Sequence, residues 1–168
     1  MVKPQVSIVM GSDSDLEIMT EAAKALSGFD IPHELQILSA HRSPERVTKF
    51  CKDLKKRGIE VVIAGAGGAA HLAGVIAAHT IVPVIGVPID SSVLKGLDSL
   101  LSTVQMPSGI PVATVAIGKS GAANAGILAA QILSVCSKEL QAKLIEHKEK
   151  LSRSVVEKNN RLKKNSQK

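Results

Sequence analysis

The feature that most constrains the fold is a regular alternation of short runs rich in Val and Ile with segments of helical periodicity. Five such runs precede helical patterns, and they cover residues 5–10, 33–38, 59–64, 82–87 and 111–116. Strands that are apolar along nearly their whole length are buried on both faces, which is typical of a parallel sheet covered by helices. We therefore predict an α/β fold, a three-layer α-β-α sandwich with a parallel sheet.

Turn signals and caps place helices after these strands. The helices are expected at about 14–26, 44–57, 70–79, 92–105 and 120–136. In a sheet of this kind, ligands bind outside the carboxyl ends of the strands, near the point where the strand order reverses. The loops at 11–15, 39–45 and 65–70 are therefore the candidate functional loops.

The C-terminal segment differs from the rest of the chain. We divide the sequence into a catalytic α/β domain at 1–137 and, at 138–168, an extended amphipathic C-terminal helix with a basic tail. Its apolar residues recur at spacings of four and seven, which places them on one narrow stripe. They are Leu140, Leu144, Leu151, Val155 and Leu162. A stripe beyond a complete domain predicts a partner, most simply another subunit. We expect disorder at 163–168.

Composition and the location of charge exclude several classes of function. The formal charge is +6, but residues 138–168 carry ten Lys or Arg and four Glu, so residues 1–137 are neutral. The chain has no Trp or Tyr with which to stack bases, so we expect no binding to nucleic acid. Residues 61–89 lack Asp, Glu, Lys and Arg, but Gly and Pro interrupt them, which favours buried strands over a membrane span. Two widely separated cysteines fit a cytoplasmic protein.

The first loop, Gly-Ser-Asp-Ser-Asp at 11–15, leaves a strand and enters a helix. Capping by Ser12 or Ser14 explains one residue, but not two Ser and two Asp together. Hydroxyls and the N–H groups of a helix start suit a phosphate, and a carboxylate such as that of Asp15 suits ribose hydroxyls.

The second loop is Ser-Ala-His-Arg-Ser-Pro-Glu at 39–45. Pro44 fits the first turn of a helix with Ser43 as its N-cap. His41 and Arg42 precede the cap, at the carboxyl end of a strand. Imidazole moves protons near neutral pH, and guanidinium binds phosphate in a forked geometry. The pair predicts a functional site, with His41 as the residue that transfers protons.

The third loop begins at Gly65 and matches G-x-G-x-x-A, with Asp90 further along the chain. A dinucleotide fingerprint belongs in the first β-α unit, whereas this pattern lies in the third. We interpret it instead as a glycine-rich wall that approaches a small anionic ligand. His71 and His79 are interpreted as packing or interface residues. No metal-ligand cluster and no Walker loop is present in the sequence, and we expect no cofactor.

Three motifs in order, GSDSD at 11–15, SAHRSPE at 39–45 and AGAGGAAHLAG at 64–74, resemble the PurE family of 5-(carboxyamino)imidazole ribonucleotide mutases. Later stretches extend the resemblance to about Leu144. Arg42 after His41 resembles the bacterial mutase class, whereas the animal-type branch, which carboxylates aminoimidazole ribonucleotide directly, carries Lys there. One departure is Ala73, where the family usually has Pro.

The resemblance implies a flavodoxin-like sandwich that assembles as an octamer, with sites near subunit contacts. It implies a small-molecule ribonucleotide substrate whose carboxylate moves from the exocyclic nitrogen to a ring carbon through enclosed CO₂, with His41 as proton shuttle. It assigns Ser12, Ala66 and Gly67 to the carboxylate and CO₂, Asp15 to the ribose, and Ser14, Ser39 and Arg42 to the phosphate. It also places Leu72 in the substrate site.

The sequence leaves three alternatives open. A direct aminoimidazole ribonucleotide carboxylase would share this site, and a non-catalytic nucleotide- or flavin-binding module would share this fold. A basic protein that associates with DNA would use the C-terminal charge, and its affinity would collapse with added salt.

Overall fold

The computed structural model describes residues 3–90 and 93–165. Within these residues, five strands form one sheet in the order β2-β1-β3-β4-β5, and all neighbouring strands are parallel. The strands are β1 (Val6–Met10), β2 (His33–Ile37), β3 (Val61–Gly67), β4 (Val84–Ile89) and β5 (Ala113–Thr114). This is the flavodoxin-like strand order, and it confirms the predicted α/β sandwich.

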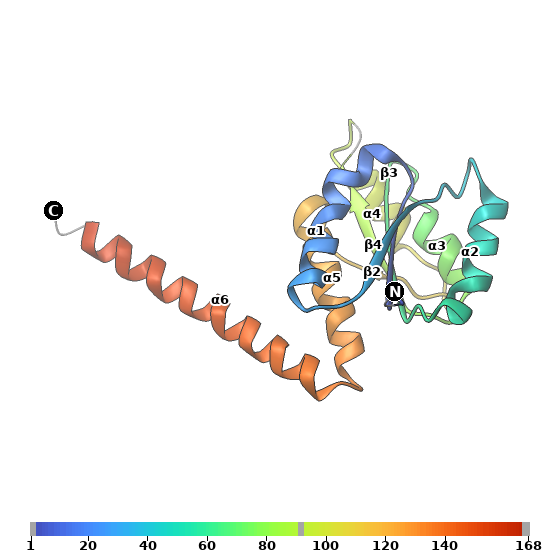
Figure 1. The fold of residues 1–168 in the computed structure, drawn as a ribbon. Helices are drawn as coiled ribbons and strands as arrows, with labels where there is room; N and C mark the ends of the chain where they lie inside the picture. The colour runs from blue at the N-terminus through green and yellow to red at the C-terminus, as the bar shows by residue number, and fades with distance from the viewer. Residues whose placement is uncertain (1–2, 91–92, 166–168) are drawn as a thin grey trace.

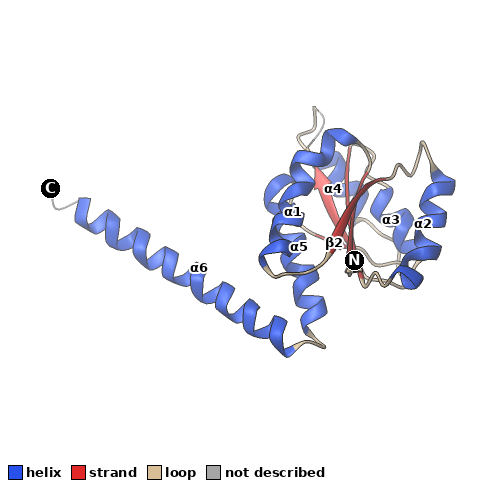
Figure 2. Ribbon diagram, in the orientation of Figure 1, coloured by secondary structure: helices blue, strands red, loops and turns tan. Residues whose placement is uncertain are grey.

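Helices cover both faces of the sheet (Figure 1, Figure 2). One face packs against α1 (Leu16–Gly28) and α5 (Gly118–Ser134), and the other packs against α2 (Pro44–Arg57) and α3 (Leu72–His79). The short α4 (Leu97–Val104) lies beside α3, because Thr103 and Ala73 both approach Gly86 on β4. A single 3-10 turn, η1 (Asp13–Asp15), precedes α1.

The layers follow from the alternation of side chains along each strand. On β1, Val6, Ile8 and Met10 join the core beneath α1 and α5, whereas Val9 joins the core beneath α2 and α3. All five residues of β1 are buried. A strand that serves two cores has no polar face, which explains why its sequence is apolar along nearly its whole length.

β3 and β4 run further toward their carboxyl ends than the sequence indicates. β3 continues through Gly65, Ala66 and Gly67, which the sequence placed in a loop. These three residues pair with Val87, Pro88 and Ile89. The residues lack the bulky side chains that mark a strand, and the pairing with β4 holds them extended. The loop begins at Gly68, whose φ of +59° turns the chain.

Two other elements are shorter than expected. α4 begins at Leu97 rather than near 92, because Lys95 and Gly96 adopt left-handed conformations that end any earlier helix. Residue 92 itself lies outside the described residues. β5 contains only Ala113 and Thr114 instead of residues 111–116, at the edge of the sheet.

The chain ends in one long helix, α6 (Lys138–Asn165), which projects from the sandwich (Figure 1). Leu140 is buried in the core beside α5, and the His147 ring meets the Phe29 ring edge-on with 5.4 Å between centroids. Beyond that contact the side chains of Leu151 and Val155 are exposed. The expected disorder from 163 is wrong for residues 163–165, which are helical, while 166–168 lie outside the described residues. No described helix is long and apolar enough to span a membrane.

Candidate active site

The three candidate loops meet at one edge of the sheet. Met10 pairs with both Ile37 and Gly65, so β1, β2 and β3 reach this edge together. A cavity of about 380 Å³ opens between the segments that follow them, within the usual size range of small-molecule sites. Every predicted site residue lines it: Ser12, Ser14, Asp15, Ser39, His41, Arg42, Ala66, Gly67 and Leu72. Gly11, Ala40, Ala69 and His71 complete the lining.

The loop after β1 presents hydroxyls around one buried acid. The Ser12 hydroxyl oxygen accepts a hydrogen bond from the Ser14 backbone N–H at 3.4 Å, so Ser12 caps η1. The Ser14 hydroxyl donates to the Asp15 carboxylate at 3.3 Å. Asp15 is only 5% exposed, and this burial raises the pKa of its carboxyl, while the hydrogen bond from Ser14 opposes the shift. A shielded carboxylate of this kind is suited to accept hydrogen bonds from the hydroxyls of a ligand.

The loop after β2 fixes a guanidinium across the mouth of the cavity. The Ser39 hydroxyl oxygen accepts from the backbone N–H of Arg42 at 3.1 Å and from its Nε at 3.3 Å. Arg42 Nη2 donates to the carbonyl of Gly11 at 2.8 Å, which ties this loop to the loop after β1. These contacts use two of the five guanidinium N–H groups, and the structure assigns the other three no partner among its described residues.

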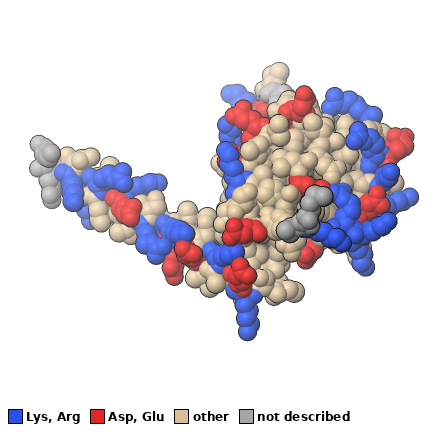
Figure 3. Space-filling view, in the orientation of Figure 1, with Lys and Arg blue, Asp and Glu red and all other residues tan. Residues whose placement is uncertain are grey.

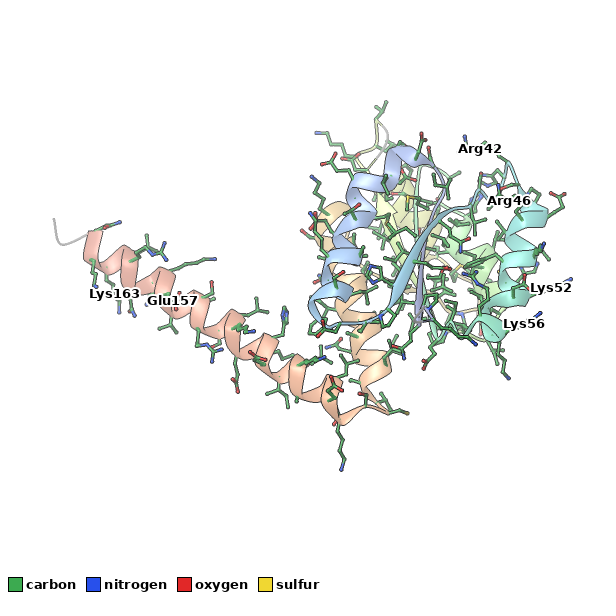
Figure 4. The ribbon with its side chains drawn as sticks, viewed as in Figure 1. Arg42, Arg46, Lys52, Lys56, Glu157 and Lys163 are labelled. Atoms are coloured by element: carbon green, nitrogen blue, oxygen red, sulfur yellow. The ribbon has the colours of Figure 1, made fainter. Side chains whose placement is uncertain are left out.

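Ser43 occupies the N-cap position of α2, as predicted, but its side chain makes no capping bond there. Its hydroxyl donates instead to the Ser39 carbonyl at 3.1 Å and accepts from the Ser39 N–H at 3.4 Å. The side chain therefore closes the loop upon itself, which brings Ser39 and Arg42 to the cavity. Figure 4 shows Arg42 and Arg46 at the same end of α2.

His41 does not stand alone in the cavity. Its Nε2 lies 2.9 Å from Nδ1 of His71, with ring centroids 5.0 Å apart and ring planes at 84°. The interpretation of His71 as a packing or interface residue missed this contact. The available signal was its position immediately before α3, after β3, at the same edge of the sheet as His41. His79 lies at the other end of α3, where its Nδ1 contacts the Val75 carbonyl.

The end of β3 and the start of α3 form the apolar wall of the cavity. Ala66 and Gly67 are half-buried there, and Leu72 is buried. On the opposite face of β3 a Cβ on Gly65 would lie 2.3 Å from the sulfur of the buried Met19, so the Met19 side chain would have to shift to admit it. Gly65 and Gly67 lie within the strand rather than in a turn that opens a helix, so they do not form the dinucleotide fingerprint.

A larger hollow of about 540 Å³ lies between α1, α5 and α6. Its charged side chains already pair with one another: Lys24 with Glu21, Lys143 with Asp30, and Lys150 with Glu146. It therefore offers a ligand few free charges, unlike the cavity at the strand ends. Among the described residues, no cluster of His, Cys, Asp or Glu has the geometry of a metal site.

Comparison with known proteins gives consistent matches over nearly the whole chain. The profile of the AIR carboxylase family matches residues 5–154. The N5-carboxyaminoimidazole ribonucleotide mutase of Pyrococcus horikoshii is 58% identical over 160 residues, which are 95% of this chain and 89% of the relative. The protein of the same name from Bacillus subtilis is 52% identical, with 96% of this chain and 99% of the relative covered. The crystal structure of Treponema denticola PurE superposes with a TM-score of 0.86 at 31% identity, covering 95% of this chain and 99% of that one.

Proposed function

The chain belongs to the AIR carboxylase (PurE) family, and from this membership we propose that it is an N5-carboxyaminoimidazole ribonucleotide mutase of purine biosynthesis. The reaction moves a carboxylate from the exocyclic nitrogen of the substrate to its ring carbon. The observation that carries this assignment is one cavity that gathers a buried acid from the loop after β1 and a tethered guanidinium and an imidazole from the loop after β2, against a wall formed by the end of β3 and the start of α3. The reaction itself is inferred from the relatives that are named N5-carboxyaminoimidazole ribonucleotide mutase.

Arg42, Ser14 and Ser39 are proposed to hold the substrate phosphate. Arg42 is tethered by Gly11 and Ser39, so its remaining N–H groups are already oriented when an anion arrives. Because the Ser39 hydroxyl oxygen accepts from Arg42, its own O–H proton can donate to phosphate. Asp15 is proposed to accept hydrogen bonds from the ribose hydroxyls, since its carboxylate is shielded from water.

Ser12 and His41 are proposed to contact the migrating carboxylate, while Ala66, Gly67 and Leu72 form the wall against which CO₂ is trapped. In the first step the C–N bond breaks, CO₂ is released, and the exocyclic nitrogen takes a proton from protonated His41. In the second step the ring carbon forms a C–C bond to CO₂ and returns its proton to His41. The two steps consume no net proton, because His41 regains the proton that it gave up. Enclosure keeps CO₂ beside the ring at high effective concentration.

The purified protein tests this assignment directly. It is offered carboxyaminoimidazole ribonucleotide alone, or aminoimidazole ribonucleotide with bicarbonate, and the formation of the carbon-carboxylated product is followed. We expect efficient turnover of the first substrate alone. Efficient conversion in the second mixture only would identify a direct carboxylase, and conversion in neither would favour a non-catalytic binding module.

A homo-oligomer, and specifically an octamer, is part of the same proposal. α4 carries exposed apolar side chains at spacings of four and three, Leu97, Leu101 and Val104, which one further subunit would cover. α6 extends its own exposed apolar residues well beyond the sandwich. We retain the division at 137/138, with the catalytic residues in the first part, and a cytoplasmic location, which fits two unpaired cysteines.

A further inference from the structure

A second and smaller cavity, of about 290 Å³, opens beside the candidate active site, and we call it the outer cavity. The two cavities share one wall, which is made of Gly11, Ser12, Ser39 and Arg42. The outer cavity adds a second guanidinium, that of Arg46, which is the third residue of α2. The function proposed above gives Arg46 no role, although its side chain lines a cavity that continues from the active site.

The guanidinium of Arg46 is available to a ligand. The residue is exposed, and the part of the chain that the structure describes offers its side chain no hydrogen bond and no ion pair. Its main chain is fixed, because its backbone N–H donates to the Ser43 carbonyl at 3.1 Å in the first turn of α2. Lys52 is also exposed on this helix, but it lines neither cavity (Figure 4).

The outer cavity has an excess of positive charge. Two guanidinium groups, those of Arg42 and Arg46, line it together with one carboxylate, that of Asp13. Oδ1 of Asp13 already accepts hydrogen bonds from the Ser12 hydroxyl at 3.0 Å and from the Ser14 backbone N–H at 3.1 Å. Guanidinium groups bind the oxygens of a phosphate through several N–H donors at once, so this cavity suits a phosphate group.

The proposed substrate carries more negative charge than the active-site cavity neutralises. A phosphate monoester has a charge of about −1.5 to −2 at pH 7, and the migrating carboxylate adds to it. Among the described residues that line the active-site cavity, Arg42 is the one permanently charged cation, and Asp15 adds an acid. A second guanidinium next to Arg42 reduces this imbalance, and Arg46 supplies one.

We propose that Arg46 is a second phosphate-binding residue of the mutase. The substrate phosphate lies where the two cavities meet, and Arg46 binds it together with Arg42 and Ser39, which line both cavities. The inference rests on the proposed function, since it takes the ribonucleotide as the ligand. Arg46 contacts no reacting atom, so it contributes to the binding of substrate and not to the proton transfers.

Ribose 5-phosphate is the probe for this subsite, because it carries the phosphate and the sugar without the reacting groups. We expect Arg46→Gln to raise its Kd, measured by calorimetry, by about 5- to 20-fold, and Arg46→Lys to recover part of the loss. Glutamine is well suited to the third position of a helix, so the substitution leaves α2 intact. Lys52→Gln removes the same charge from the same helix and is the matched control, with a change of less than about twofold expected.

Turnover of carboxyaminoimidazole ribonucleotide separates binding from chemistry. In Arg46→Gln we expect KM to rise by a factor similar to that for Kd, while kcat stays within about twofold of the wild-type value. An unchanged Kd in Arg46→Gln overturns the inference, and so does an equal rise in Lys52→Gln, which would reflect net charge alone. A fall in kcat with unchanged KM would place Arg46 in the chemistry and would also overturn it. Because the binding of ribose 5-phosphate needs no turnover, a protein that binds it through Arg46 but shows no mutase activity contradicts the proposed function alone.

Discussion

The loops of the cavity are held by their own side chains, so individual residues there combine a structural role with a proposed role in binding or catalysis. Arg42 closes the gap between the loops after β1 and β2, and Ser39 holds the guanidinium against the cavity. Asp15 is the exception, because its burial opposes the charged form that the proposed ribose contact requires. A residue of this kind lowers the stability of the protein in return for its proposed function. Its substitution is therefore expected to raise stability and to lower activity.

Asp15→Asn is expected to stabilise the protein and to weaken its activity. The raised pKa of Asp15 means that its contribution to stability is complete at low pH and is lost as the pH rises through the folded-state pKa. At pH 7.5 the amide removes this cost, and we expect Tm to rise by roughly 2–4 °C, about 1 kcal/mol for a domain of this size. KM for the ribonucleotide rises at the same time.

The pH dependence of melting is the discriminating measurement for Asp15. The difference in Tm between variant and wild type should narrow as the pH falls toward about 4, where an ordinary aspartate takes up its proton. A difference that stays constant over this range would show that the stabilisation arises from something other than the charge. Ser14→Ala, which removes the hydroxyl bonded to Asp15, should act in the opposite direction at neutral pH.

His41→Asn tests the proton shuttle. The amide cannot take up and return a proton, so we expect turnover to fall at least about 100-fold. Arg42, Asp15 and the serines are unchanged, so the Kd for the ribonucleotide, measured by calorimetry, should stay within a few-fold of the wild-type value. Near-normal turnover would refute the assigned role of His41.

At the scale of elements, the site depends on close packing behind it. Helix α1 begins at the end of the loop after β1 and packs against α5. The two helices approach each other closely at Gly126, which has no side chain. A Cβ on Gly126 would lie 2.7 Å from the Ala22 carbonyl oxygen and 2.7 Å from the Ala25 Cβ. Backbone and a short side chain cannot move aside as the end of a long side chain can, so this glycine sets the distance between the two helices.

Gly126→Ala is expected to destabilise the protein by about 1–3 kcal/mol, because it forces α1 and α5 apart. Urea denaturation gives the free energy of unfolding. Gly28→Ala, at the end of α1, is the matched control: no heavy atom outside its chain neighbours lies within 4 Å of the added Cβ. It should change stability by less than about 0.5 kcal/mol. Equal effects of the two substitutions would mean that the contact between α1 and α5 is not as tight as described.

The elements also show which features a sequence can reveal. The parallel sheet and the loop positions follow from alternation, and the resemblance to the PurE family supplied the flavodoxin-like arrangement and the rest of the residues that line the cavity. The extension of β3 through Gly65 and Gly67 was not predictable, because glycine carries no strand signal and the pairing with β4 imposes the conformation. The contact of His41 with His71 was missed for a related reason: it joins two loops, and a pattern within either loop says nothing about the distance between them.

At the scale of the whole molecule, charge and apolar surface are distributed unevenly. Basic side chains gather along α6 and over α2 (Figure 3), and Lys52 and Lys56 lie on the outer side of α2 (Figure 4). The net charge of +6 belongs to residues 138–168, so it says little about the cavity in the neutral part of the chain. The cavity is proposed to bind the substrate phosphate through Arg42 and its neighbouring serines, and the exposed apolar residues of α4 and α6 indicate where further subunits are proposed to pack.

Leu101→Glu tests this assembly at the centre of the apolar face of α4. Leu97 and Val104 lie one turn to either side of it, and all three are about half exposed in the single chain. Burial of a leucine contributes roughly 1.5–3 kcal/mol, and burial of an unpaired carboxylate at the same contact costs more than that. Symmetry repeats the cost at every equivalent contact, so one substitution is expected to dissociate the oligomer.

Sedimentation velocity measures the mass of the assembly that the variant forms, and circular dichroism measures its secondary structure. Gln105→Glu adds the same charge at an exposed position just beyond the end of α4, and we expect it to keep the wild-type mass. Since Leu101 faces water in the single chain, Leu101→Glu should leave the secondary structure intact while the mass falls. An unchanged mass would exclude the α4 face from the assembly and would direct the search for the subunit contact to other exposed apolar residues, those of α6 among them.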